Sequence, residues 1–146
     1  MKMTVETAVK AKLNTVWDTW NNPKDIMQWN APQADWHTTS SAVDLREGGK
    51  FKARMEAKDG SEGFDFEGVY TRIVPKKEIE YRMSDGREVK VEFIESNGSV
   101  IVKETFDTEN TYTPEHQRQG WQNIMDNFGR HVEAKRSRVY KRSPGN

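Results

Sequence analysis

A long amphipathic stretch near the C-terminus constrains the fold of this chain more than any other feature. Its large apolar residues recur at i, i+3, i+4, i+7 and i+11, the spacing of one helical face: Trp121, Ile124, Met125, Phe128 and Val132. Thr113 is expected to cap the helix and Pro114 suits its first turn, so the pattern predicts a helix over residues 113–135. Since no other segment has a long helical pattern, a sheet is needed to cover this apolar face.

The residues before position 36 predict one strand and two short helices. Residues 3–10 alternate between apolar and polar side chains, as a strand does. Two short helical patterns follow. The first is expected to be capped by Asn14 and the second by Asn22, with Pro23 in its first turn. The Trp-rich faces of both helices favour packing within the domain over reading of DNA.

The central part of the chain, up to Phe106, has the pattern of strands joined by tight turns. Apolar and charged residues alternate with a period of two, and Asp85-Gly86 and Asn97-Gly98 are strong hairpin signals. Successive hairpins form an antiparallel meander with one buried face. The predicted fold class is therefore α+β: a curved antiparallel sheet of six to seven strands that grips a long C-terminal helix, with two short helices after the first strand.

Short motifs along the chain match those of a known family in order and spacing. They are Val16-Trp17 with Trp29, Leu45-Arg46-Glu47-Gly48-Gly49-Lys50-Phe51, Phe66-Glu67-Gly68-Val69-Tyr70, Val91-Glu92-Phe93, Glu104-Thr105-Phe106 and Gly120-Trp121-Gln122-Asn123-Ile124-Met125-Asp126-Asn127-Phe128. On these motifs the chain resembles the START-like superfamily (helix-grip, or SRPBCC, fold), and within it the bacterial single-domain proteins grouped with activators of heat-shock chaperone ATPases. The resemblance implies a START-like domain over residues 1–135, followed by a basic tail, 136–146, that is expected to be flexible. Members of the superfamily bind lipids, hormones or polyketides in a cavity, and a few catalyse reactions there.

The strand and helix patterns also place one carboxylate and several large side chains on inward faces. Glu104 shares a strand face with Val102 and Phe106. It is either a polar anchor or proton-transfer group in an apolar cavity, or it pairs with a cation, lies at the mouth of the cavity or is turned outward by a bulge. The residues predicted to line the cavity and bind a ligand are Trp29, Phe66, Tyr81, Met83, Phe93, Glu104, Trp121, Met125 and Phe128. These bulky side chains either line an open cavity or fill it, and a volume of about 300 Å³ or more would favour ligand binding.

Composition and missing motifs disfavour several other kinds of site. The chain has no Cys, which excludes disulfides and zinc–thiolate sites and favours a cytoplasmic location. Its histidines, His37, His116 and His131, are isolated, and no catalytic or phosphate-binding motif is present, so no metal, cofactor or catalytic residue is predicted. No apolar run reaches the roughly 20 residues that span a bilayer, and the body of the chain has no basic stripe. Neither membrane insertion nor nucleic-acid binding is expected.

Three functional hypotheses follow from these observations. The first is non-catalytic binding of a small hydrophobic molecule in the cavity between sheet and helix. The second, which the family resemblance implies, is an interaction module that contacts a chaperone or another protein, with a link to the stress response. The third is a cavity enzyme of the cyclase or hydrolase kind, in which Glu104 transfers a proton.

Overall fold

The computed structural model describes the backbone of residues 1–141 and the side chains of residues 1–135. In chain order the elements are β1 (Lys2–Val9), α1 (Leu13–Asn21), α2 (Pro23–Trp29), β2 (Trp36–Val43), β3 (Lys50–Ala57), β4 (Gly63–Val74), β5 (Glu78–Met83), β6 (Glu88–Ser96), β7 (Ser99–Asp107) and α3 (Pro114–Lys141). Within this range no helix is long and apolar enough to cross a membrane.

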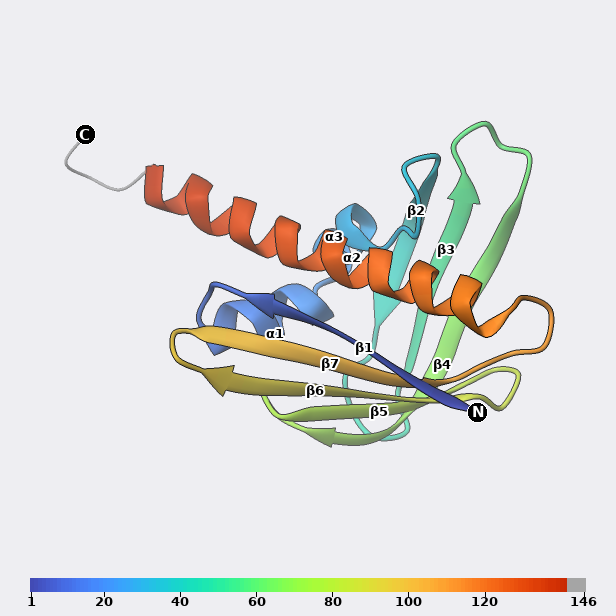
Figure 1. Cartoon of the computed structure of the whole chain (residues 1–146), viewed down its shortest axis with the longest axis horizontal. Coiled ribbons are helices and arrows are strands. Elements are labelled where there is room, and N and C mark those ends of the chain that lie inside the picture. Colours follow the sequence, from blue (N-terminus) through green and yellow to red (C-terminus); the bar gives the residue numbers. More distant parts are fainter. Residues whose placement is uncertain (142–146) are drawn as a thin grey trace.

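The strands form one seven-stranded sheet in the order β1-β7-β6-β5-β4-β3-β2. Every neighbouring pair is antiparallel. The first strand therefore joins the sheet beside the last one, and the remaining strands follow as a meander. Figure 1 shows β1, β7, β6 and β5 running beneath α3, whereas β2, β3 and β4 rise behind it. This curved sheet with its long C-terminal helix confirms the predicted fold class.

The two predicted hairpins occur where the turn dipeptides lie. Asn97 and Gly98 join β6 to β7 with φ angles of 48° and 82°, the left-handed pair that a two-residue hairpin requires. Between β5 and β6 only Gly86 is left-handed, with φ of 93°, and its N–H donates a hydrogen bond of 2.9 Å to the Met83 carbonyl in a longer turn. Gly49 has a different role, because a Cβ there would collide with the carbonyl oxygen of Asp44. Its own carbonyl instead accepts a hydrogen bond of 2.9 Å from the Tyr70 N–H, so the chain before β3 lies directly against β4.

The helix caps agree with the sequence except in α1. The Asn22 side chain accepts a hydrogen bond of 2.9 Å from the Lys24 N–H at the start of α2, as predicted. Thr113 likewise accepts one of 3.1 Å from the His116 N–H at the start of α3. The predicted cap at Asn14 is wrong, because α1 already begins at Leu13, and Lys12 holds the capping position without a side-chain hydrogen bond.

Helix α3 is longer at its C-terminal end than the sequence pattern predicts. It continues to Lys141, whereas the apolar stripe ends at Val132 and the predicted helix at 135. The predicted basic tail, 136–146, thus begins inside this helix, and its residues 142–146 lie outside the described part of the chain. The flexibility of the tail stays a prediction.

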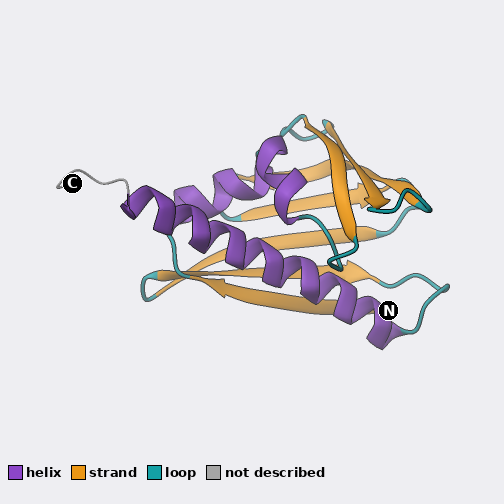
Figure 2. Ribbon diagram, turned by 90° about the horizontal axis from the view of Figure 1, so that it is seen from above, coloured by secondary structure: helices purple, strands orange, loops and turns teal. Residues whose placement is uncertain are grey.

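The core is filled by aromatic rings where α1, α2 and the middle of α3 meet the sheet. The ring centroid of Phe128 lies 5.0 Å from that of Trp20 and 5.0 Å from that of Trp29, and the Trp17 centroid lies 5.1 Å from that of Phe93. In Figure 2 both short helices lie beside α3, on the same side of the sheet. Helix α3 also packs along β1, since Gly129 leaves room for Thr7. The helix is therefore fixed at its middle and C-terminal part.

Candidate ligand pocket

A pocket of about 760 Å³ lies between the N-terminal half of α3 and strands β2 to β5. It forms because α3 packs on β1 and the short helices, while the rising strands β3 and β4 curve away from it. Most of its wall is apolar or aromatic. The large side chains that line it are Trp20, Ile26, Trp29, Trp36, Phe51, Met55, Phe64, Phe66, Tyr70, Ile79, Tyr81, Met83, Tyr112, Trp121 and Ile124.

The structure divides the residues predicted to bind a ligand into two groups. Those that border the pocket are Trp29, Phe66, Tyr81, Met83, Glu104 and Trp121. Phe93, Met125 and Phe128 do not border it; they are buried and belong to the core. Met125 and Phe128 lie along the part of α3 that is covered by the core, whereas Trp121 lies further toward its N-terminus, beside the pocket. Both predicted alternatives, lining and filling, therefore occur at different points of one helix.

Glu104 is a carboxyl group among apolar neighbours. On the inner face of the sheet it lies between Val91 of β6 and Val5 of β1, and Ile79 of β5 continues the same row. Glu104 is 4% exposed, and among residues 1–135 its carboxyl group has no hydrogen bond or ion pair. Burial raises the pKa of Glu104 to about 8, so the neutral carboxylic acid predominates at pH 7.

The register around Glu104 decides between the alternatives drawn from the sequence. Strand β7 pairs without interruption with β1 and β6, so no bulge turns the side chain outward. Nor does a cation among the described residues pair with it. Glu104 thus borders the pocket as an acid without a partner among residues 1–135.

Two tyrosines supply further polar groups to the pocket. Tyr70 and Tyr81 are buried, and within residues 1–135 their hydroxyl groups have no hydrogen-bond partner. Burial raises the pKa of Tyr81, and the nearby Glu104 raises it further. Phe51 holds both rings in place, with centroids 5.3 Å from Tyr70 and 4.7 Å from Tyr81. The pocket therefore combines a large apolar wall with a carboxyl group and two phenols.

Several pocket residues were not among those predicted from the sequence. Phe51 alternates with the charged Lys50 and Lys52, and Tyr70 shares the strand face of Phe66, so the period of two was the available signal. The rings of Trp36 and Phe64, which both border the pocket, contact each other with centroids 5.8 Å apart and planes tilted by 55°, and Phe64 is exposed. Their pairing depends on how β2 and β4 lie on either side of β3, which a single strand pattern does not contain.

The connection between α2 and β2 closes another side of the pocket and is held by α3. The Asn123 side chain donates to the Pro32 carbonyl at 3.0 Å, and the Asn127 side chain donates to the Ala31 carbonyl at 2.7 Å. From the other direction, the Thr38 hydroxyl donates to the Asn30 carbonyl at 2.6 Å. Side-chain hydrogen bonds to the backbone thus fix this wall.

A buried charge cluster attaches α2 to the C-terminal part of α3. The Asp25 carboxylate lies 2.9 Å from His131 Nε2 and accepts a hydrogen bond of 3.0 Å from the Lys135 ammonium. Burial acts to raise the pKa of Asp25, but the hydrogen bonds from His131 and Lys135 outweigh it and hold that pKa below its ordinary value. His131, predicted as an isolated histidine, therefore has a structural partner.

No group of three or more metal-ligating side chains occurs within the described residues. His131 is engaged by Asp25, and the His116 ring stacks on Tyr112 with centroids 4.8 Å apart. His37 lies on β2, away from both of these histidines in the sequence. The described residues thus offer no preformed site for a metal ion.

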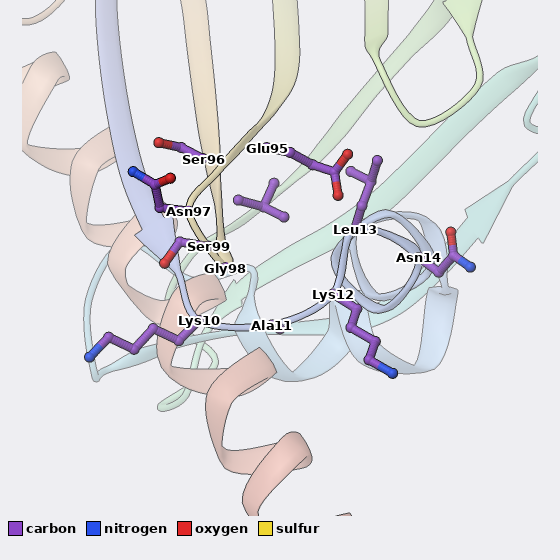
Figure 3. A pocket seen from close by; sticks show the side chains of 11 residues that line it. Lys10, Ala11, Lys12, Leu13, Asn14, Glu95, Ser96, Asn97, Gly98 and Ser99 are labelled. Carbon is purple, nitrogen blue, oxygen red and sulfur yellow. The ribbon is translucent and has the colours of Figure 1, made fainter.

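A second hollow, of about 1030 Å³, lies where the β6–β7 hairpin approaches the link between β1 and α1. It is lined by residues 10–14 and 95–100, and Figure 3 shows the Lys10 and Lys12 side chains pointing away from the hairpin. Although it is larger, its wall consists mainly of turn backbone and short or charged side chains. It borders none of the predicted ligand-binding residues, and the aromatic pocket beside α3 is the better candidate for a site.

Solved structures of two bacterial proteins are similar to this chain in sequence as well as fold. An AHSA1-like protein from Aeromonas hydrophila, solved by NMR, is 49% identical, with a TM-score of 0.86 over 92% of this chain and 94% of that one. A protein from Cytophaga hutchinsonii is 40% identical, with a TM-score of 0.80 over 93% of this chain and 94% of that one. The chain thus spans nearly the full length of both relatives.

More distant comparisons agree with the fold. A protein from Nitrosomonas europaea is 15% identical, with a TM-score of 0.78 over 94% of this chain and 97% of that one, and it supports the fold alone. Among curated proteins none matches the chain significantly. The family model described as Activator of Hsp90 ATPase homolog 1-like protein matches residues 10–133. The chain therefore belongs to this family and has the START-like, helix-grip fold that its motifs predicted.

Proposed function

We propose that this protein binds a small, largely apolar molecule, without catalysis, in the pocket between α3 and strands β2 to β5. The observation that carries the proposal is the pocket itself, whose volume of about 760 Å³ lies within the usual range for small-molecule sites. Its wall is mainly aromatic, with a few polar groups that converge from Glu104, Tyr70 and Tyr81. That combination is typical of sites that bind an apolar body and orient it through a few polar contacts.

The distribution of the aromatic residues further supports the proposal. The Phe66 ring lies between Trp121 of α3, with centroids 6.2 Å apart, and Tyr81 of β5, with centroids 6.3 Å apart. These three rings border the pocket. Phe128 does not border it and packs against Trp20 and Trp29 in the core. A flat apolar ligand would bury its faces against rings that the protein leaves partly uncovered.

Native mass spectrometry of the freshly purified protein, followed by a panel of lipids and aromatic compounds, tests the proposal. A bound compound, or a mass shift with a member of the panel, is the expected result. Ala53→Phe places a ring in the pocket wall and should lower the affinity for that compound by about tenfold or more. Ile94→Phe adds a ring on an exposed part of β6 that does not line the pocket, so it is the matched control. Absence of any bound or binding compound would contradict the proposal.

A second candidate function is contact with a heat-shock chaperone. It is favoured by the family match over residues 10–133, whose description refers to activators of the Hsp90 ATPase. A role of this kind would place the protein in the cytoplasm and in a stress response. Stimulation of a purified bacterial chaperone ATPase by this protein, with unchanged stimulation by Ala53→Phe, would favour surface contact over pocket binding. No effect on the ATPase would remove this candidate. The catalytic alternative rests on Glu104 alone.

A further inference from the structure

We infer that the ligand of this pocket is an amphiphilic amine, whose ammonium group lies at Glu104 and whose apolar body lies against the aromatic wall. The inference depends on the proposed binding function and adds the chemical class of the ligand. It is drawn from the unpaired acid in the pocket, from the charges around it and from the surrounding rings.

The first step concerns the partner that Glu104 lacks. Its neighbours on the sheet are Val5, Val91 and Ile79, none of which offers a hydrogen bond through its side chain. A buried carboxyl group without a partner is costly, and buried acids in proteins are normally paired. Since Glu104 is 4% exposed and borders the pocket, the partner has to come from within the pocket. An ammonium group both neutralises and hydrogen-bonds a carboxylate.

The second step concerns the charges that surround the pocket. The acidic residues that line it are Glu62, Asp65, Glu67, Asp85, Glu104 and Glu109, and the lysine and arginine residues are Lys52 and Arg87. Both cations are engaged by acids of the same lining, Lys52 with Asp65 at 3.5 Å and Arg87 with Asp85 at 2.8 Å. The excess negative charge gives the pocket a potential that concentrates cations and repels anions.

The third step concerns the rings near Glu104. Tyr81 lies close enough to Glu104 for that carboxyl group to raise its pKa, and Trp121 borders the same pocket from α3. Cations are attracted to the faces of Trp and Tyr rings, which suits an ammonium group and the carbons next to it. A carboxylate ligand would meet Glu104 and the acidic lining with the same sign of charge. A neutral alcohol would gain a single hydrogen bond.

Binding of an amine should also release a proton from the protein. The titratable groups that face Glu104 are Tyr81 and, further along β4, Tyr70, while β1 and β6 present valines and α3 presents Trp121. None of these supplies a positive charge. Because burial keeps Glu104 protonated at neutral pH, an incoming ammonium group favours the carboxylate and expels that proton.

The inference is tested by measuring the affinity of compounds that combine one of two apolar bodies, naphthalenemethyl or decyl, with one of three terminal groups. These groups are an amine, an alcohol and a carboxylate. We expect the amine to bind about tenfold or more tightly than the alcohol and the carboxylate with at least one body. Glu104→Gln should remove that preference and change alcohol affinity by less than about threefold. Glu92→Gln, on the opposite face of β6 from Val91, is the control and should retain it.

Calorimetry at pH 7 in two buffers of different ionisation enthalpy supplies a second measurement on the unmodified protein. Release of a proton with the amine, and none with the alcohol, is expected, and this result does not depend on whether Glu104→Gln folds. Equal affinities for amine and alcohol, or tighter carboxylate binding, would overturn the inference and leave the proposed function standing. If no probe with either body binds, both are overturned.

Discussion

The indole ring of Trp121 on α3 stacks on the phenyl ring of Phe106 on β7, with centroids 4.2 Å apart and planes 6° from parallel. Phe106 is fully buried, whereas Trp121 is half-buried and borders the pocket. One face of the indole therefore belongs to the core, and the ring also reaches toward Phe66 across the pocket. This stacked pair marks the boundary between the filled and the open part of the interior.

Replacement of Trp121 by Ala should affect both stability and binding. The lost stacking and the cavity left behind should lower the free energy of unfolding by about 2–4 kcal/mol. Urea denaturation followed by circular dichroism measures this change. Phe128→Leu, at a buried core residue that does not itself border the pocket, is the comparison, and it should weaken binding of any pocket ligand far less than Trp121→Ala does. Equal losses of affinity in the two variants would contradict the placement of Trp121 at the pocket.

Glu104 should make the protein less stable as the pH rises from about 4.5 to about 8. In that interval the folded protein keeps the proton that the unfolded chain releases, so the unfolded state binds fewer protons. The free energy of unfolding then falls by up to about 1.4 kcal/mol per pH unit. Denaturant unfolding across this pH range should show the decline in the unmodified protein and a smaller one in Glu104→Gln. A slope unchanged by this substitution would contradict the assignment.

Loss of the Asp25 carboxylate should loosen the attachment of α2 to α3. Asp25→Asn leaves His131 and Lys135 without their acid and should cost about 1–3 kcal/mol of stability at pH 7. Because the pKa of Asp25 is lowered in the folded state, its contribution is present above the ordinary pKa of an aspartate. The contribution is lost as the pH falls through the lowered value. Unfolding at pH 7 and at about pH 3 should therefore differ less in Asp25→Asn than in the unmodified protein.

The two glycines of α3 should respond differently to substitution by Ala. A Cβ at Gly120 would meet no atom within 4 Å, so Gly120→Ala should stabilise the protein by about 0.5–1 kcal/mol through helix propensity. At Gly129 the Cβ would lie 3.1 Å from the Thr7 hydroxyl. This close contact should reduce or reverse the gain in stability that helix propensity gives. Thermal unfolding of both variants measures the difference, and a larger gain at Gly129 than at Gly120 would contradict the close packing of α3 on β1.

The sequence predicts those parts of the fold that follow from short repeats of apolar residues or from turn dipeptides. The helical stripe through Met125 and Phe128 follows from a spacing of 3.6, and the face that Glu104 shares with Phe106 follows from a spacing of 2. The turns at Gly86 and Gly98 follow from their dipeptides. It does not separate the rings that line the pocket from those that fill the core. That division depends on where the curved sheet bends away from the straight helix, and this position depends on how all the elements of the domain pack together.

Contacts between distant segments were equally hidden in the sequence. Asp25 and His131 meet only because α2 folds back onto α3, and neither residue has a distinctive local pattern. The error at Asn14 has a different origin, since Asn at the start of a helical pattern is a good cap, but the helix begins one residue earlier, at Leu13. Tertiary packing therefore explains the contact between Asp25 and His131, whereas the error at Asn14 concerns a local helix boundary.

The hydrogen bonds from Asn123 and Asn127 to the carbonyls of Pro32 and Ala31 leave the side chains of that connection unconstrained. Every amino acid carries a carbonyl, so residues of this wall can be exchanged without loss of the bonds that hold it. Strands β3 and β4 are likewise paired through their backbones, so this pairing does not depend on which side chains face the pocket. A change of side chain in this wall would therefore reshape the pocket without releasing the connection from α3.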